Sequence, residues 1–187
     1  MRVSPTPGTT RYAVWLHAVN LGSHNKVPMA WLRDAATDAG FEGVATYLQS
    51  GNLVVSSAAT ADVVRNQVTA LIRDGRDLDV DVTVRSRTQL ARVIDRNPMR
   101  DRVGEPSKLH VSFLTGKPDA QGVASIDVEK YAPDEFVVSG TEIYLWFPNG
   151  AGRSKLATLP WRKKVGVGGT ARNWRTVLAM LELLDEG

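Results

Sequence analysis

The chain has 187 residues, of which 43% are hydrophobic and 23% are charged, and it carries a net charge of +3. This length suits one domain or two small ones, and no stretch approaches the roughly 18 apolar residues that a membrane span requires. Cysteine is absent, which excludes disulfides, thiolate nucleophiles and cysteine-ligated metal sites.

Residues 1–10 contain two prolines and no apolar core. They do not resemble a signal peptide, and we expect them to form a loose tail. With no signal peptide and no membrane span, we expect a cytoplasmic protein that has no membrane partner.

Residues 12–19 are mostly apolar and are typical of a buried strand. Residues 28–39 begin with a proline, repeat apolar side chains at helical spacing and precede Gly40, so they predict the first helix. Strand-like runs at 44–49 and 53–57 flank the turn sequence Ser50-Gly51-Asn52 and predict a hairpin.

A second helix is predicted from Thr60, which can cap it, to Gly75, which can end it. Residues 80–84 alternate apolar and polar side chains, as a half-buried strand does. The order strand, helix, strand, strand, helix, strand predicts a ferredoxin-like βαββαβ subdomain over residues 11–97, with two helices on one face of an antiparallel sheet.

A connecting helix reaches about Arg96 and is ended by Asn97-Pro98. We expect a second small α+β subdomain over residues 107–187, so the fold class is α+β throughout. Its predicted elements are a strand at 109–114, a weak helix at 119–131, a hairpin at 135–139 and 142–147, a helix from 154 to 159 or beyond, and a last helix at 171–184.

The charge of the chain is strongly segregated. Between Ile143 and Leu181 there is no acidic residue, and the local charge is +7, which leaves −4 for the rest of the chain. The basic residues of this window are Arg153, Lys155, Arg162, Lys163, Lys164, Arg172 and Arg175. Such asymmetry indicates an anionic partner.

The sequence Gly150-Ala151-Gly152-Arg153-Ser154-Lys155 follows a predicted strand and is expected to open a helix. Free backbone N–H groups, the positive end of the helix and two cations would then coincide, which favours an anion site formed by Arg153, Ser154 and Lys155. The spacing differs from that of a nucleotide-binding P-loop. A solvated helix start with basic side chains is an equally good interpretation.

A second glycine-rich run, Gly166 to Gly169, is expected to lead into the last helix and to place Arg172 and Asn173 in its first turn. The run fits a degenerate dinucleotide fingerprint, but we reject that interpretation because the fingerprint needs a strand before it, a strand after it and an acidic residue about twenty positions on, whereas the sequence ends at Gly187. Loop flexibility and capping by Thr170 are the alternative to a binding role.

Asn20, Ser50 and Asn52 lie at strand ends and turns, where ligand contacts are common, although asparagine and serine also occupy turns for conformational reasons. They are secondary candidates. The three histidines show no metal-ligand spacing, and we expect structural roles for them. We predict no metal site and no cofactor.

Four blocks of sequence resemble a known family. They are Asn20-Leu21-Gly22 with Asn25-Lys26-Val27-Pro28-Met29, then Thr46 to Val54, then Gly152-Arg153-Ser154-Lys155-Leu156, then Thr170-Ala171-Arg172-Asn173-Trp174. In this order they are similar to the bacterial domain-of-unknown-function family 1697, over about residues 11–184. The resemblance implies two α+β subdomains, the first ferredoxin-like, and it supplies no activity, cofactor or catalytic residue.

The chain departs from the family at one place. Where the family typically has Arg-Gly-Ile-Asn after the first strand, this sequence has His17-Ala18-Val19-Asn20. The chain thus lacks a cation and a glycine there. If that arginine contacts a ligand in relatives, His17 does not supply the same cation in this chain.

Three functions remain open from the sequence. The first is a small protein that binds a phosphate-bearing or other anionic ligand, nucleic acid included, through Arg153, Lys155 and Arg172, with Ser154 and Asn173 orienting it. The second is an enzyme that acts on a phosphorylated or nucleotide-like small molecule. The third is a protein-interaction or dimerisation module that faces an acidic partner. The sequence sets neither the ligand nor the oligomeric state.

Overall fold

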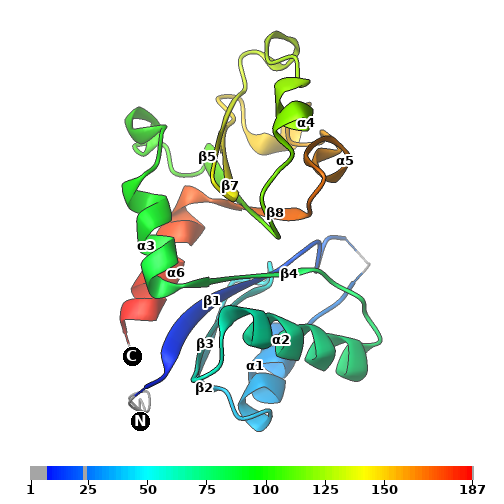
Figure 1. Cartoon of the computed structure of the whole chain (residues 1–187), viewed down its shortest axis with the longest axis vertical. Coiled ribbons are helices and arrows are strands. Elements are labelled where there is room, and N and C mark those ends of the chain that lie inside the picture. The colour runs from blue at the N-terminus through cyan, green and yellow to red at the C-terminus, as the bar shows by residue number, and fades with distance from the viewer. Residues whose placement is uncertain (1–7, 23–24, 187) are drawn as a thin grey trace. The chain divides into compact units, whose positions relative to one another are not determined.

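A computed structural model describes residues 8–22 and 25–186 of the chain (Figure 1). The tail predicted for residues 1–10 lies mostly outside the described residues. The chain forms two compact units, of which the first comprises Met1–Arg92 with Ala179–Gly187 and the second comprises Val93–Leu178. No helix in the described part of the chain is long and apolar enough to cross a membrane.

The first unit contains a four-stranded sheet and two long helices. In chain order its elements are β1 (Thr10–Leu16), α1 (Met29–Asp38), β2 (Glu42–Tyr47), β3 (Asn52–Ser57), α2 (Ala61–Arg76) and β4 (Val82–Ser86). The strands lie in the order β2-β3-β1-β4, and every neighbouring pair is antiparallel. The predicted order of strand, helix, strand, strand, helix, strand is therefore observed.

The core of the first unit lies between this sheet and the helices α1 and α2. Alternate residues of β1, such as Val14 and Leu16, are fully buried against apolar side chains of both helices, including Leu32 and Ile72. Because side chains alternate between the two faces of a strand, the same strand presents Ala13 and Trp15 to the opposite face.

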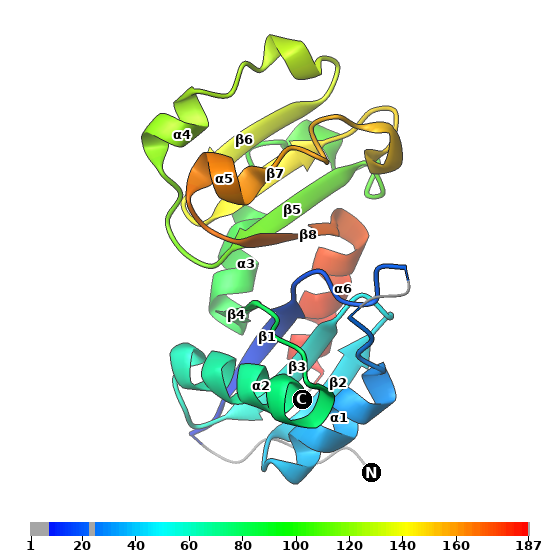
Figure 2. The same ribbon diagram turned by 90° about the vertical axis from the view of Figure 1, so that its right-hand side faces the viewer.

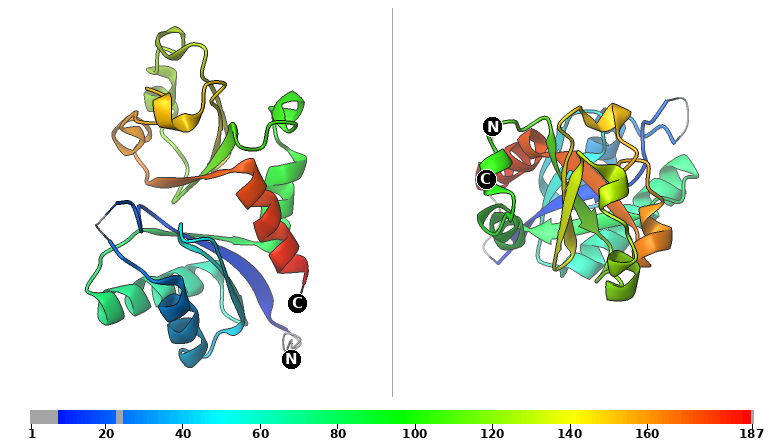
Figure 3. Two further views of the ribbon diagram at one scale, coloured as in Figure 1. Left: turned by 180° about the vertical axis from the view of Figure 1, so that it is seen from behind. Right: turned by 90° about the horizontal axis from the view of Figure 1, so that it is seen from above.

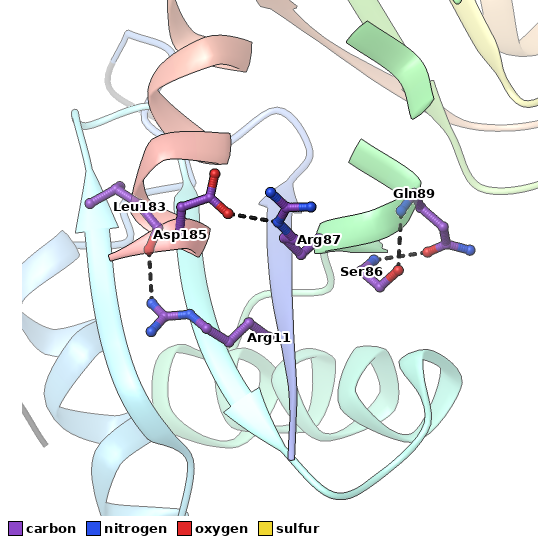
Figure 4. Close-up of polar contacts among 6 residues, drawn as sticks. All are labelled: Arg11, Ser86, Arg87, Gln89, Leu183 and Asp185. Carbon is purple, nitrogen blue, oxygen red and sulfur yellow. Dashed lines mark hydrogen bonds and ion pairs between the residues drawn. The ribbon is translucent and has the colours of Figure 1, made fainter. Parts of the chain in front are cut away.

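The opposite face of the first sheet is also buried, because Ala13 and Trp15 are 0% exposed. The end of α6 (Trp174–Asp185) lies on this side, whereas α1 and α2 lie on the other (Figure 3). Arg11 of β1 donates a hydrogen bond to the carbonyl oxygen of Leu183, and Arg87 pairs with Asp185 (Figure 4). Within the first unit, two arginines thus hold the last turn of α6, one from β1 and one from the residue that follows β4.

The second unit contains another four-stranded antiparallel sheet, with the strand order β6-β7-β5-β8 (Figure 2). Its strands are β5 (Leu109–Leu114), β6 (Glu135–Ser139), β7 (Glu142–Trp146) and β8 (Gly169–Asn173). Its helices are the end of α3 (Arg87–Asp95), α4 (Ala120–Ala124), α5 (Trp161–Val165), the start of α6, and the 3-10 turns η1 (Arg100–Arg102), η2 (Glu129–Tyr131) and η3 (Ala151–Arg153).

One face of the second sheet carries an apolar cluster. Leu114, Ile143 and Leu145 from the strands pack with Leu156, and Trp161 of α5 packs against the same cluster. The short helices α4 and α5 lie over this face (Figure 2). Gly122 of α4 permits their close approach, because a Cβ there would lie 1.8 Å from the carbonyl oxygen of Lys164.

The predicted α+β class is confirmed, and most elements appear within a few residues of their predicted bounds. Two predictions are wrong. The helix expected at 154–159 is a series of turns after the three-residue η3, and the helix expected from Ala171 begins only at Trp174, because residues 169–173 form the edge strand β8. The weak helix expected at 119–131 is divided into α4 and η2.

Candidate functional site

A pocket of about 200 Å³ lies in the second unit, where the segment after β7 meets the segment before β6. We call it the basic pocket. The residues that line it are Lys130, Tyr131, Ala132, Pro133, Asp134, Asn149, Gly150, Arg153, Ser154 and Lys155. It therefore contains the three candidates Arg153, Ser154 and Lys155 that the sequence placed in one block.

The local backbone explains why these side chains reach the pocket. Gly150 has a φ of 84° and allows the chain to turn after β7, and no atom lies within 4 Å of the Cβ that it lacks. Ser154 is buried and its Oγ accepts a hydrogen bond of 2.8 Å from the N–H of Ala157. Leu156 is fully buried in the apolar cluster. The chain is anchored at Ser154 and Leu156, while Arg153, just before Ser154, and Lys155, between the two anchors, are exposed.

The pocket is electropositive. Lys130, Arg153 and Lys155 contribute three positive charges and Asp134 contributes one negative charge. Within the described part of the chain, no carboxylate forms an ion pair with any of the three cations. Surface cations are often paired with neighbouring acids, so three that converge unpaired on one pocket form an attractive site for an anion.

Arg172 lies elsewhere. It sits on β8 opposite Val111 of β5, which in turn lies opposite Tyr144 of β7, so these three side chains share one face of the sheet. The apolar cluster that contains Leu156 includes Ile143 and Leu145, the residues on either side of Tyr144 in β7, and their side chains lie on the other face of the sheet. The structure therefore does not bring Arg172 to the basic pocket.

The surroundings of Arg172 are those of a buried structural side chain. It is 8% exposed, and its Nη1 donates to the Oγ1 of Thr170 at 2.6 Å and to the carbonyl oxygen of Ala171 at 2.9 Å. Burial removes water from the guanidinium and lowers its pKa to about 10. Both of these acceptors belong to β8, so Arg172 stabilises the conformation of the edge strand.

Asn173 also has a local role. Its Oδ1 accepts a hydrogen bond of 2.9 Å from the N–H of Thr176, which makes it the N-cap of α6. Its side-chain oxygen is thus occupied by the helix that it starts.

The secondary candidates organise loops of the first unit. Asn20 has a φ of 58°, its Oδ1 accepts from the N–H of Val27, and its Nδ2 donates to the carbonyl oxygens of Val27 and Gln49. Asn52 is fully buried and its Nδ2 donates to Ser50 and to the carbonyl oxygen of Tyr47. These contacts show that all three residues stabilise the conformation of the loops, which explains why polar side chains occupy these positions.

Sequence reasoning missed Lys130, Asp134 and Asn149. Lys130 and Asp134 lie outside the acid-free window, so no charge pattern pointed to them, and only the fold brings them beside Arg153. Asn149 directly precedes Gly150 and was within reach of the sequence argument. The sequence predicted structural roles for the histidines. His17 is hydrogen-bonded to Thr83 at 2.7 Å in the buried interior, while His24 lies outside the described residues.

Over residues 8–22 and 25–186, no group of three acidic or histidine side chains is arranged to hold a metal ion. The basic pocket offers donors for an anion and a single carboxylate, which is not a ligand set for a cation.

The family described as protein of unknown function (DUF1697) matches residues 9–144 of this chain. Among solved structures, the fold is similar to that of a conserved bacterial protein from Streptococcus pneumoniae, with a TM-score of 0.74 and 21% identity over 94% of this chain and 99% of the other. The family predicted from the sequence blocks is thereby confirmed, and the matched residues include the first two of the four blocks. Comparison with curated proteins gives no match.

Proposed function

We propose that this chain, which belongs to the family of proteins of unknown function DUF1697, binds a small anionic molecule in the basic pocket of its second unit. The leading ligand class is the phosphate ester of a small hydroxylated molecule. The observation that carries this proposal is the convergence of three cations, Lys130, Arg153 and Lys155, on one pocket in which none has an ion-pair partner among the described residues.

The chemistry of the lining suits a phosphate group. Arginine presents a planar fork of N–H donors and lysine a compact charge, and both are common phosphate ligands. Because the Oγ of Ser154 accepts the N–H of Ala157, its own hydroxyl hydrogen is left to donate toward the pocket. Asp134 would accept a hydrogen bond from a hydroxyl group on the rest of the ligand.

The size of the pocket favours a small molecule over nucleic acid. Proteins that bind single strands combine an extended basic groove with exposed aromatic side chains on which bases stack. Of the five aromatic residues in the acid-free window, however, Tyr144, Trp146, Phe147 and Trp174 are buried, and Trp161 is half-buried against the apolar cluster. A pocket of about 200 Å³ accommodates a phosphate group and a small body.

Isothermal titration at low salt tests the proposal, with inorganic phosphate, glycerol 3-phosphate and ribose 5-phosphate as probes. We expect Arg153→Gln and Lys155→Gln each to weaken binding by about tenfold, which corresponds to about 1.4 kcal/mol for one lost charged hydrogen bond. Lys163→Gln is the matched control, because Lys163 is an exposed cation of α5 outside the pocket and its loss changes the net charge equally.

The control decides between a pocket and diffuse charge. Selective loss in the Arg153 and Lys155 variants supports the pocket. Equal loss in all three variants contradicts it and points to nonspecific attraction. A short DNA or RNA strand that binds more tightly than every phosphate ester, with an affinity that falls steeply with salt, overturns the choice of a small ligand.

A further inference from the structure

A second pocket of about 560 Å³ lies in the second unit, bounded by the end of α3, the turn η1 and the start of α6. We call it the α3–α6 pocket. Every residue that lines it belongs to the second unit, and none of them lines the basic pocket. Its volume is within the range of roughly 300 to 1,000 Å³ typical of small-molecule sites.

Two opposite charges lie together in this pocket. Arg100 donates a hydrogen bond to the main-chain carbonyl oxygen of Asp95, so its guanidinium is held beside that residue. The Asp95 carboxylate nevertheless forms no ion pair with a described residue, and neither does Arg100. Both side chains are exposed and are available to a ligand.

The remainder of the pocket is largely apolar. Val103 is 43% exposed and Leu178 is 37% exposed, and both line the pocket together with Ile94 and Trp174. Large apolar side chains that remain exposed beside a pocket provide a surface for the apolar part of a ligand.

The pocket also contains an unpaired buried donor. Asn97 is 3% exposed, and its Oδ1 accepts a hydrogen bond of 2.8 Å from the N–H of Met99, which fixes the orientation of the amide. Its Nδ2 finds no acceptor in the described part of the chain. Buried polar groups nearly always have a partner, so this donor calls for one.

We propose that the α3–α6 pocket binds a free α-amino acid with an apolar side chain. The ligand's carboxylate pairs with Arg100, its ammonium group with Asp95, and its side chain contacts Val103 and Leu178. Nδ2 of Asn97 has less than 1 Å² exposed and its amide is held by the N–H of Met99, so it donates to the ligand's carboxylate only after the amide turns toward the pocket and gives up that hydrogen bond.

A zwitterionic amino acid fits the charges of Asp95 and Arg100 better than a ligand that carries only one charge. A simple carboxylic acid would pair with Arg100 but would place its negative charge beside Asp95, and a simple amine would meet the converse repulsion. A zwitterion satisfies both groups at once. Contacts with Val103 and Leu178 would then make leucine or phenylalanine bind more tightly than glycine.

The test is calorimetric titration of the full chain with L-leucine and L-phenylalanine, up to about 10 mM because single amino acids often bind weakly. Four comparison ligands each lack one feature: glycine, isovaleric acid, isoamylamine and N-acetyl-leucine amide. We expect binding of leucine and phenylalanine and at least about tenfold weaker binding of every comparison ligand.

Variants make the test specific to the pocket. Asp95→Asn and Arg100→Gln should each weaken leucine binding by about tenfold. The exposed residues Asp127 and Lys117 lie outside the pocket, so Asp127→Asn and Lys117→Gln should leave binding unchanged. In the wild type, the side-chain amide signal of Asn97 should move in a ¹⁵N–¹H spectrum as leucine is added.

The absence of leucine and phenylalanine binding overturns the proposal. Equal binding of N-acetyl-leucine amide overturns it as well, and so does leucine binding that Asp95→Asn and Arg100→Gln leave intact. All four substitutions are at exposed positions, so we expect each variant to fold. Circular dichroism before the titration checks this.

Discussion

Arg11, on the first strand of the chain, donates a hydrogen bond of 2.8 Å from Nη2 to the carbonyl oxygen of Leu183, near the end of the last helix (Figure 4). The last four carbonyl groups of a helix lack partners within it, and the helix dipole places partial negative charge there. Asp185 and Glu186 add two acids at the same end. These negative charges repel the negative end of the helix dipole and destabilise the end of α6. The positive charges of Arg11 and Arg87 offset this repulsion.

Replacing Arg11 by alanine should lower the free energy of unfolding by about 1 to 2 kcal/mol, because a charged hydrogen bond to a helix carbonyl is lost. Burial lowers the pKa of Arg11, and the negative charges of Glu186 and Asp185 offset part of this effect. Urea unfolding measures the change. Arg33→Ala, on the exposed side of α1, is the matched control and should change the free energy by less than about 0.5 kcal/mol.

Tyr144 provides a prediction at high pH. Burial, with a smaller contribution from the charge of Glu142, raises the pKa of its hydroxyl above the ordinary value of 10.0, and the hydroxyl donates to the carbonyl oxygen of Val93 at 2.7 Å. The folded protein therefore holds this proton longer than the unfolded chain does. The stabilisation is present below pH 10 and decreases as the pH rises above it.

We expect the free energy of unfolding to fall more steeply above pH 10 in the wild type than in Tyr144→Phe. Tyr47→Phe serves as the control, because Tyr47 is only half-buried. Denaturant unfolding at pH 9 and near pH 10.5 gives both slopes. Parallel slopes in the wild type and in Tyr144→Phe would show that Tyr144 titrates normally.

His110 should make the protein sensitive to acid. Burial lowers its pKa below the ordinary 6.5, against a smaller opposing effect of the hydrogen bond to the carbonyl oxygen of Lys108. Its ring also packs edge-on against Phe147, with centroids 5.1 Å apart. Protonation therefore favours the unfolded state, and the free energy of unfolding should fall as the pH drops below about 6.5.

The comparison of wild type with His110→Gln between pH 7 and about pH 5 isolates this effect from the titration of the carboxylates. The variant should lose less of its stability over this interval. A chemical-shift titration of the His110 ring that gives an ordinary midpoint would refute the assignment.

Gly51 should tolerate no side chain. Its φ is 75°, and a Cβ would lie 2.6 Å from Cγ2 of Val19 and 2.8 Å from Cβ of Leu16. We expect Gly51→Ala to cost at least about 2 kcal/mol of stability, from backbone strain and overpacking together. Gly104→Ala is the control, because no atom lies within 4 Å of its Cβ position and its φ is not positive. Thermal melting that gives the same loss for both would contradict the steric argument.

Local patterns were sufficient to predict the first unit from the sequence. The alternation in β4, the apolar stripe of α2 and the turn at Ser50-Gly51-Asn52 each reflect contacts that a segment makes along one face. The edge strand β8 was missed because its five residues, Gly169–Asn173, begin with glycine and contain a charged arginine, and neither is typical of a strand. Pairing with β5 overrides those preferences.

The candidate site was predictable only in part. Arg153, Ser154 and Lys155 are consecutive, so the sequence could group them. Lys130 and Asp134 come from a segment about twenty residues earlier, and only the packing of the chain brings them to the same pocket. Arg172 was assigned to the wrong environment, because the sequence could not show that strand pairing turns it to the other face of the sheet.

The most direct measurement is a ¹⁵N–¹H titration of the full chain with inorganic phosphate at low salt. We expect the backbone signals from Gly150 to Lys155, together with that of Lys130, to shift together and to saturate with one dissociation constant, while those of Arg162, Lys163 and Lys164 do not. Shifts that grow linearly without saturation, or that centre on Arg162 to Lys164, would contradict the basic pocket as the binding site.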